Sequence, residues 1–317
     1  MRSKYEKIDL SKVRTISIQN RRSKVNTSEF AKVFDPKTQS FSDFIDSLPD
    51  ILVAKDLKML VDKIVNAHKK NKLVIFLIGA HVIKVGLAPL LIELGKIGVI
   101  KALAMNSATA IHDVETALFG QTSEDVAENI MDGSFGMAKE TGDFINLTLK
   151  EYCENSDLGY GEALGKKLND INAPNKDYSV LASYYNLDIP VTVHAAIGTD
   201  IVHQQPTMDG SATGEMSFRD FKILCNVLTQ LDSESVVVNI GSAVIMPEVF
   251  LKALTVVRNL GYNAFGFTTA NFDMLRHYRP TVNVVQRPTQ GGGTGLMITG
   301  HHEIMIPLLV AMIKSKI

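Results

Sequence analysis

The amino-acid sequence predicts an α/β protein with a doubly wound, mostly parallel sheet and helices on both faces. Short apolar runs alternate along the chain with longer segments whose apolar residues recur at helical spacing. Several of these short runs are continuous rather than alternating, which is typical of parallel strands buried on both faces. Regular alternation of such strands with helices favours a parallel sheet over an antiparallel one.

The first fifty residues have a different character from the remainder. They are polar and irregular, with the basic cluster Arg21-Arg22-Ser23-Lys24 and the turn-prone Asp35-Pro36-Lys37. We therefore expect an N-terminal arm over residues 1–50, packed on a neighbour or on the domain surface, and a single α/β domain over residues 51–317. Asp50 to Lys70 has apolar residues at helical spacing and predicts a helix.

The elements of the domain follow in order. Leu73 to Ile78 predicts a strand that Gly79 ends, and a helix from Val85 to Leu94 and a strand from Ile100 to Met105 come next. A further helix is expected near His112, and residues 124–185 are expected to be mainly helical. The remaining predicted strands are Pro190 to Ala195, Ser235 to Ile240, Asn263 to Phe267 and Thr281 to Val285. The remaining predicted helices are Phe218 to Leu231, Pro247 to Leu260 and His301 to Ile313.

Composition excludes several classes of partner. The 317 residues include 33 basic and 34 acidic side chains, so no charge footprint for nucleic acid or an anionic membrane is present. The longest apolar runs, about ten residues, are too short to cross a bilayer, and the start lacks a secretory apolar run. Cys153 and Cys225 form no CxxC pattern and imply no disulfide framework. We expect a cytoplasmic protein with no nucleic-acid or membrane partner.

Polar residues cluster where the predicted strands end. Ligands of open parallel sheets bind in the crevice beyond the carboxyl ends of the strands, so this clustering predicts a pocket there. The residues concerned are Gly79 and His81; Asn106, Ser107, His112 and Asp113; His194, Asp200, His203 and Asp209; Gly241, Ser242 and Glu248; Thr268, Thr269, Asn271 and Asp273; and His301, His302 and Glu303.

Two glycine-containing segments differ in placement. Gly291 to Gly295 is not a G-x-G-x-x-G sequence, so it does not predict a Rossmann fingerprint. It is compatible with a phosphate-binding turn, a mobile lid or a flexible surface turn. Gly241-Ser242 lies between a predicted strand and a predicted helix, where small residues allow close approach of a nucleotide. We expect the Gly291 loop and His301-His302-Glu303 to close the pocket.

Five stretches resemble the deoxyhypusine synthase family, over a match that runs from about residue 70 to the end. They are Gly79 to Leu87, Asn106 to Asp113, Ile189 to Asp200, Asp209 to Met216 and Ile306 to Ala311. The resemblance implies a single large NAD-binding α/β domain, a small-molecule substrate and a homo-oligomer, a dimer or tetramer, with sites at dimer interfaces. An insertion splits one motif, so either Asp200 or Asp209 could be the family's aspartate.

Carried over by position, the resemblance implies cofactor contacts as well. They would involve Gly79, His81, Asn106, Ser107, His112, Asp200, Gly241, Ser242, Thr269, Ala270 and His301. Two of these positions depart from the family, because His81 stands where the family has asparagine and His301 where it has aspartate.

The substrate side departs further. The family uses a lysine nucleophile in its C-terminal region, and here no lysine occurs between Lys252 and Lys314. The family also stacks a tryptophan on its polyamine substrate, and this chain has none. We therefore do not expect classical deoxyhypusine synthesis.

Three functions remain open from the sequence. The first is NAD-dependent chemistry on a small, cationic amine or related metabolite, as a transferase or an amine oxidoreductase, since carboxylates hold amines and histidine acts as a base. Its candidate catalytic residues are His112, Asp113, Asp200, Glu248, His302 and Glu303. The second is a metal-dependent enzyme, although no short ligand motif is present. Its candidate ligands are His81, His112, Asp113, His194, Asp200, His203, His301, His302 and Glu303. The third is a metabolite-binding protein without catalysis.

Overall fold

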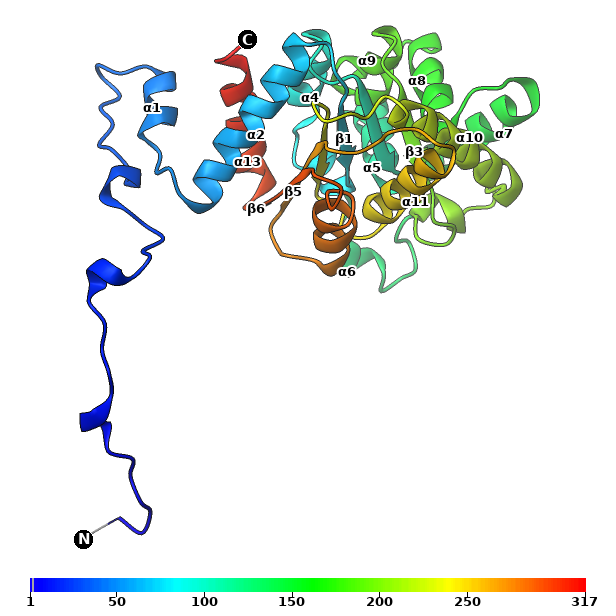
Figure 1. The fold of residues 1–317 in the computed structure, drawn as a ribbon. Helices are drawn as coiled ribbons and strands as arrows, with labels where there is room; N and C mark the ends of the chain where they lie inside the picture. Colours follow the sequence, from blue (N-terminus) through cyan, green and yellow to red (C-terminus); the bar gives the residue numbers. More distant parts are fainter. Residues whose placement is uncertain (2) are drawn as a thin grey trace. The chain divides into compact units, whose positions relative to one another are not determined.

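The computed structural model describes residue 1 and residues 3–317, which form two compact units, Met1–Ile51 and Leu52–Ile317 (Figure 1). The first unit contains three 3-10 turns, η1 (Leu10–Lys12), η2 (Ile18–Asn20) and η3 (Thr27–Glu29), and one helix, α1 (Phe41–Ser47). Ser40 and Asp43 form a reciprocal capping box that starts α1. Large apolar side chains of this unit, such as Ile16 and Val33, are exposed.

The second unit is built on six parallel strands in the order β3-β2-β1-β4-β5-β6, as far as the described residues show. The strands are β1 (Val74–Ile78), β2 (Ala102–Asn106), β3 (Val191–His194), β4 (Val236–Ile240), β5 (Thr268–Asp273) and β6 (Thr294–Thr299). This is the strand order of a doubly wound dinucleotide-binding sheet. The predicted fold class is confirmed, and the sheet is parallel throughout.

Helices cover both faces of the sheet (Figure 1). On one face, the odd-numbered residues of β1 and β4 pack with α10 (Gly210–Leu228), α11 (Ile245–Asn259) and the π-helix η6 (Thr281–Gln286). On the other, α2 (Leu52–Lys69) contacts β1, β4, β5 and β6, and α13 (His302–Lys314) packs on α2 and α4 (Ala88–Lys96).

The remaining helices connect these layers. They are α3 (Ala80–Lys84), α5 (Ser107–Phe119), α6 (Val126–Asn129), α7 (Lys139–Asn155), α8 (Tyr160–Asp170), η4 (Lys176–Tyr178), α9 (Val180–Asn186), η5 (Ile201–Gln204) and α12 (Tyr278–Pro280). The short helix α3 was not predicted. It begins directly after β1 and ends before Gly86, whose φ of 81° lies in the left-handed region that glycine tolerates.

The prediction of a strand at Asn263 to Phe267 was wrong by several residues. The fifth strand is Thr268–Asp273, and all six of its residues are buried. Its asparagine finds a partner inside the sheet: Asn239 Nδ2 donates to Asn271 Oδ1 at 2.6 Å, across the β4–β5 pair. A strand with so few large apolar residues gives little periodic signal, which explains the shift.

The prediction of a strand at Thr281 to Val285 was also wrong, because this segment is the π-helix η6. Pro280 precedes it with φ −59° and ψ −41°, a helical conformation that proline favours. The sixth strand lies instead in the glycine-containing segment that was expected to be a loop. A Cβ at Gly295 would lie 2.1 Å from the Val285 carbonyl oxygen, so glycine lets η6 pack directly on β6.

No helix in the part of the chain that the structure describes has both the length and the apolar character needed to cross a membrane.

Candidate functional site

The candidate site lies where the order of the strands reverses. β1 and β4 are neighbours, but the chain leaves β1 toward β2 and leaves β4 toward β5, so a crevice opens between the two exits. Gly79 follows β1 and Gly241 follows β4. The Gly79 N–H donates to the Ile240 carbonyl at 2.9 Å, and a Cβ at Gly79 would lie 2.1 Å from the Gly241 carbonyl oxygen. The floor of the switch point is therefore formed by the backbone of these two turns, which the glycines let pack directly against each other.

Two histidines stand at this floor, His81 from α3 and His302 from the first turn of α13. Their ring centroids are 5.6 Å apart. His302 is 1% exposed, and its Nδ1 has no hydrogen-bond partner. A Cβ at Gly241 would lie 2.9 Å from His302 Nε2, so the ring packs against this glycine. A buried ring nitrogen without a partner is costly and is a place where a ligand can bind.

Burial and the neighbouring Asp273 carboxylate shift the pKa of His302 in opposite directions. Burial lowers the pKa of His302 most, and the Asp273 carboxylate at the end of β5 opposes this shift. The imidazole is therefore predominantly neutral at pH 7. Asp273 also lies 4.0 Å from His277 Nε2.

The three residues of the His301-His302-Glu303 sequence do not act together. His301 Nδ1 lies 3.6 Å from Glu303 Oε1, but these side chains are 64% and 49% exposed. Successive helical residues point about 100° apart, so only His302 turns into the fold. The structure thus brings His302 to the switch point and leaves His301 and Glu303 at the surface.

A cavity of about 810 Å³ lies beyond the ends of β1, β2 and β3. Its walls come from α3, α5, the segment 121–126, the start of α7 and the residues after β3. The charged residues lining it are the carboxylates Glu115, Glu124, Glu140 and Asp200 and the cation Lys84. This excess of negative charge suits a cationic ligand.

His112 lines the cavity from α5, as part of a hydrogen-bonded chain. Its Nδ1 lies 2.6 Å from Thr122 Oγ1, and Thr122 donates to Glu115. Thr141 Oγ1 donates to the other oxygen of Glu115 at 3.1 Å. Burial lowers the pKa of His112; Glu115 opposes this shift and Lys84 reinforces it.

Asp200 lines the same cavity from the other side. It accepts a hydrogen bond from Ser107, the first residue of α5, and lies 3.7 Å from His203 Nε2. Burial raises the pKa of Asp200, while Ser107 and His203 favour its charged form. His203 Nδ1 accepts from two backbone N–H groups at 3.2 Å, so the neutral ring carries its proton on Nε2, facing Asp200.

Asp209, the other candidate for the family's aspartate, caps α10. It accepts from the N–H groups of Ser211 and Ala212 at 2.9 and 3.0 Å. The geometry therefore favours Asp200 over Asp209 as the carboxylate that faces a ligand.

Asp113 was expected to be catalytic, but the structure favours a structural role. It has no exposed surface and accepts from Ser179 Oγ and from the N–H groups of Val180 and Leu181, at 2.7 and 3.1 Å for the latter two. These contacts tie α5 to the first turn of α9. Burial is the main cause that raises its pKa to about 6, and the three donors oppose it.

Three of the expected cofactor residues are buried inside the sheet or cap a helix. Thr269 and Ala270 are buried in the interior of β5. Ala270 is three residues before the carboxyl end of the strand, about 10 Å away, so direct contact with a ligand in the crevice is not expected. Asn106 Oδ1 caps α5 by accepting from the Thr109 N–H at 3.1 Å.

Glu248 lies in the first turn of α11, where cations compensate its charge. Its Oε1 is 3.2 Å from Arg279 Nε and accepts from Asn283 Nδ2 at 2.9 Å, and Lys252 pairs with its other oxygen. These contacts connect α11 to η6. We assign Glu248 to this connection rather than to catalysis.

The Gly291 loop lies at the opposite end of the strands from the switch point. It leads into the amino end of β6, whereas the switch point lies at the carboxyl ends of the strands. The prediction that this loop closes the pocket was therefore wrong.

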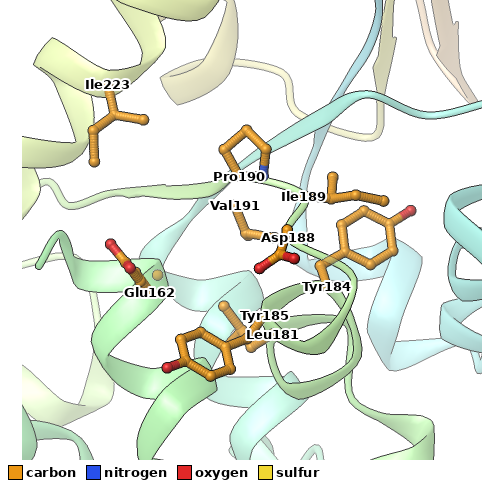
Figure 2. Close-up of a pocket in the computed structure, with 10 residues that line it drawn as sticks. Glu162, Leu181, Tyr184, Tyr185, Asp188, Ile189, Pro190, Val191 and Ile223 are labelled. Atoms are coloured by element: carbon orange, nitrogen blue, oxygen red, sulfur yellow. The ribbon is translucent and has the colours of Figure 1, made fainter. Parts of the chain in front are cut away.

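A smaller cavity of about 260 Å³ lies at the amino end of β3, and Figure 2 shows its lining residues. Pro190 and Val191 of the chain entering β3, Glu162 of α8 and the Tyr184 and Tyr185 pair of α9 surround it. Ligands of doubly wound sheets bind at the carboxyl ends of the strands, so this cavity is not the candidate site.

Metal-dependent chemistry finds no support in the geometry. Among residue 1 and residues 3–317, no three His, Cys, Asp or Glu side chains are grouped so that they could hold a metal ion. One expected ligand, His194, is buried against Thr192 Oγ1 at 2.9 Å, and burial lowers its pKa to about 3.

Sequence reasoning missed several residues that line the cavity. Glu115 lies one turn after His112 on the same helix, a spacing that could have identified it. No comparable signal identifies Lys84, Thr122, Glu140 and Thr141. They lie outside α5, and their approach to it depends on the tertiary fold.

Comparisons by sequence identify no relative of this chain. No family model matches it, and no curated protein matches it.

Solved structures with a similar fold do exist, at low sequence identity. A candidate deoxyhypusine synthase from Entamoeba histolytica has a TM-score of 0.51 and 13% identity, over 89% of this chain and 96% of that one. A candidate LOR/SDH protein from Methanococcus maripaludis S2 has a TM-score of 0.52 and 15% identity, over 84% and 71%.

AgrE, in a ternary complex with ornithine and NAD+, has a TM-score of 0.53 and 14% identity, over 82% of this chain and 32% of AgrE. This chain also spans 33% of ArgZ, a cyanobacterial arginine dihydrolase, so it covers about a third of both enzymes. At these identities the similarity concerns the fold alone. The chain has the deoxyhypusine synthase-like α/β fold.

Proposed function

We propose that this protein binds NAD or a related dinucleotide at the β1–β4 switch point and acts on a small cationic amine in the adjoining cavity. The observation that carries the proposal is the position of the two regions. Gly79 and Gly241 form the switch point, and Lys84 of α3, the helix that follows Gly79, lines a cavity of about 810 Å³ together with four carboxylates. In sheets of this strand order, dinucleotides bind at such a switch point.

Two features of the switch point support a dinucleotide there. They are the strand order and His302 Nδ1, a buried polar atom without a partner in the protein. AgrE, of similar fold, was solved with NAD+. The turn after β1 lacks the G-x-G-x-x-G sequence, and α3 has only five residues. We therefore expect the Gly241-Ser242 turn and His302 to provide the main contacts.

The cavity fits an amine because of its charge. Glu115, Glu124, Glu140 and Asp200 outnumber the single cation Lys84 among its charged lining residues. AgrE was also solved with ornithine, a cationic amino acid. When bound, NAD supplies a hydride acceptor. The residues of this chain would bind the amine, orient it and hold its proton, which favours an amine oxidoreductase over a transferase.

The first experiment measures NAD+ binding by isothermal titration calorimetry. The wild type should bind NAD+, and Gly241→Ala should weaken binding about tenfold or more, since its Cβ would push against His302. Gly266→Ala is the matched control: it also has a positive φ, 79°, and a Cβ contact at 3.0 Å, but it precedes β5, at the amino ends of the strands. Absence of binding at millimolar NAD+ by the folded wild type would refute the proposal.

A second experiment tests the amine. The probes are 1,4-diaminobutane and L-ornithine, titrated into the wild type, Glu140→Gln and Glu154→Gln. Glu140 lines the cavity at the start of α7, and Glu154 is exposed on the same helix about 20 Å further along. Weaker binding in Glu140→Gln alone would support the cavity as the amine site. Equal binding by all three proteins would place the amine elsewhere.

Two further properties belong to the proposal. The homo-oligomer, a dimer or a tetramer, rests on the resemblance to the family, and light scattering of the purified protein tests it. A cytoplasmic location rests on the cysteine pattern, Cys153 and Cys225 being free thiols.

A further inference from the structure

We propose that His112 Nε2 accepts the proton of the substrate ammonium, and that Thr122 and Glu115 are positioning residues that fix the tautomer of His112. The identity of the substrate rests on the function proposed above. The tautomer rests only on hydrogen bonds of this chain.

The hydroxyl of Thr122 determines the direction of the chain of hydrogen bonds. It has a single proton, and both His112 Nδ1 and a Glu115 oxygen lie within hydrogen-bond distance. A carboxylate can only accept, so Thr122 donates to Glu115. The hydroxyl oxygen must then accept from His112, and this requires the proton of the neutral imidazole to be on Nδ1.

This assignment leaves Nε2 as the acceptor. His112 lines the cavity, and its Nδ1 is already bound to Thr122, so Nε2 is the nitrogen left for a ligand. The other oxygen of Glu115 accepts from Thr141 Oγ1 at 3.1 Å. Two hydroxyl donors thus hold the Glu115 carboxylate in a fixed orientation.

The electrostatic surroundings suit a base at neutral pH. Burial keeps the His112 ring predominantly neutral; Lys84 of α3 has the same effect, and Glu115 acts in the opposite direction. Glu124 of the loop after α5, Glu140 of α7 and Asp200 after β3 face the same cavity. These carboxylates would stabilise an imidazolium once it forms.

The proton transfer is balanced without any further reagent. One N–H bond of the ammonium breaks, the nitrogen keeps the electron pair, and an N–H bond forms at His112 Nε2. The positive charge moves to the ring, where Glu115 compensates it through Thr122. The transfer leaves a lone pair on the substrate nitrogen. Loss of hydride from the adjacent carbon requires this lone pair.

The test reads the tautomer in the ligand-free protein by long-range ¹H–¹⁵N NMR, with ¹⁵N-labelled histidine. His112→Gln assigns the signals. The wild type should carry the proton of neutral His112 on Nδ1. Thr122→Val should move it to Nε2, because the valine offers no acceptor. Glu115→Gln should lower the pKa of His112 by about one unit, since the compensating charge is lost.

Thr116→Val is the matched control. Thr116 lies on the same helix, and its hydroxyl donates to the His112 backbone carbonyl at 2.8 Å, not to the ring. It should leave the tautomer unchanged. A proton on Nε2 in the wild type, or an unchanged tautomer in Thr122→Val, would overturn the assignment whether or not NAD+ binds.

Turnover of 1,4-diaminobutane with NAD+ separates the base from its positioning residues. His112→Gln should lower kcat by about 10²-fold or more, and Thr122→Val should lower it less, with KM for the diamine retained. Unchanged turnover in His112→Gln would refute the role as a base, even with the predicted tautomer. Failure of NAD+ binding by the wild type would refute the proposed function and leave the tautomer result standing.

Discussion

Asp220 tests how burial raises the pKa of a carboxyl group in this protein. It lies in α10 without exposed surface. Its Oδ2 accepts from the Val193 N–H at 2.6 Å and the Gly161 N–H at 2.9 Å, which ties β3 to α8, while Oδ1 has no partner. Asp220→Asn can keep one oxygen in the position of Oδ2 and removes the ionisable group.

The size of the effect follows from the pKa of Asp220. Burial is the main cause that raises it from 3.8 to about 8; the backbone donors oppose this shift, and Glu162 adds to it. The shift spans about 4 pH units, and each unit corresponds to about 1.4 kcal/mol. Because the folded chain holds the proton that the unfolded chain has lost, stability falls as pH rises through this window. Between pH 5 and pH 7 the loss is about 3 kcal/mol.

Urea denaturation at pH 5, 6 and 7 measures this difference. The free energy of unfolding of Asp220→Asn, relative to the wild type, should rise by about 3 kcal/mol from pH 5 to pH 7. Asp113 contributes equally to the pH dependence of both proteins, so its contribution cancels in the difference between them. Asp209→Asn, in which asparagine still caps the same helix, should run parallel to the wild type. A difference between Asp220→Asn and the wild type that is constant with pH would refute the reasoning.

Three other predictions concern packing. Gly295→Ala should lower the free energy of unfolding by about 2 kcal/mol or more, because its Cβ would meet the η6 backbone. Gly214→Ala, on α10 with open space around its Cβ, should raise the free energy of unfolding slightly. Urea denaturation measures both. His302→Ala should cost about 1–3 kcal/mol, while the exposed His301→Ala should change stability by less than about 0.5 kcal/mol, and equal effects in thermal denaturation would contradict the burial of His302 alone. Asp113→Ala should cost about 3 kcal/mol or more by leaving the α9 donors unpaired, and a variant as stable as the wild type would contradict the capping role.

The sequence predicted the first four strands well because each is rich in apolar residues and ends in, or is followed by, glycine or a polar residue. β1, a continuous apolar run with every residue buried, is the clearest case. The last two strands were misplaced for a physical reason. The one asparagine of β5, Asn271, is hydrogen-bonded within the sheet, and β6 contains a glycine that serves packing rather than a turn. Neither property appears in a pattern of apolar residues.

The site was predictable to the level of strand ends and no further. Strand ends and helix starts indicated His81, His302, His112 and Asp200; in the structure the two first named lie together at the switch point, and His112 and Asp200 line the cavity. Sequence could not distinguish them from Asp113, which follows His112 directly. One residue of helix rotation, about 100°, separates a side chain that lines the cavity from one that caps a neighbouring helix.

The short helix α3 connects the two parts of the proposed site. His81 lies near the His302 ring at the switch point, and Lys84, three residues later, lines the cavity beside His112. Residues three apart on a helix lie on the same side, about 5–6 Å from each other. A dinucleotide over the histidine pair and an amine near His112 would therefore be close neighbours, as transfer between them requires. Because α3 begins directly after β1, the end of that central strand would position both ligands of the proposed site.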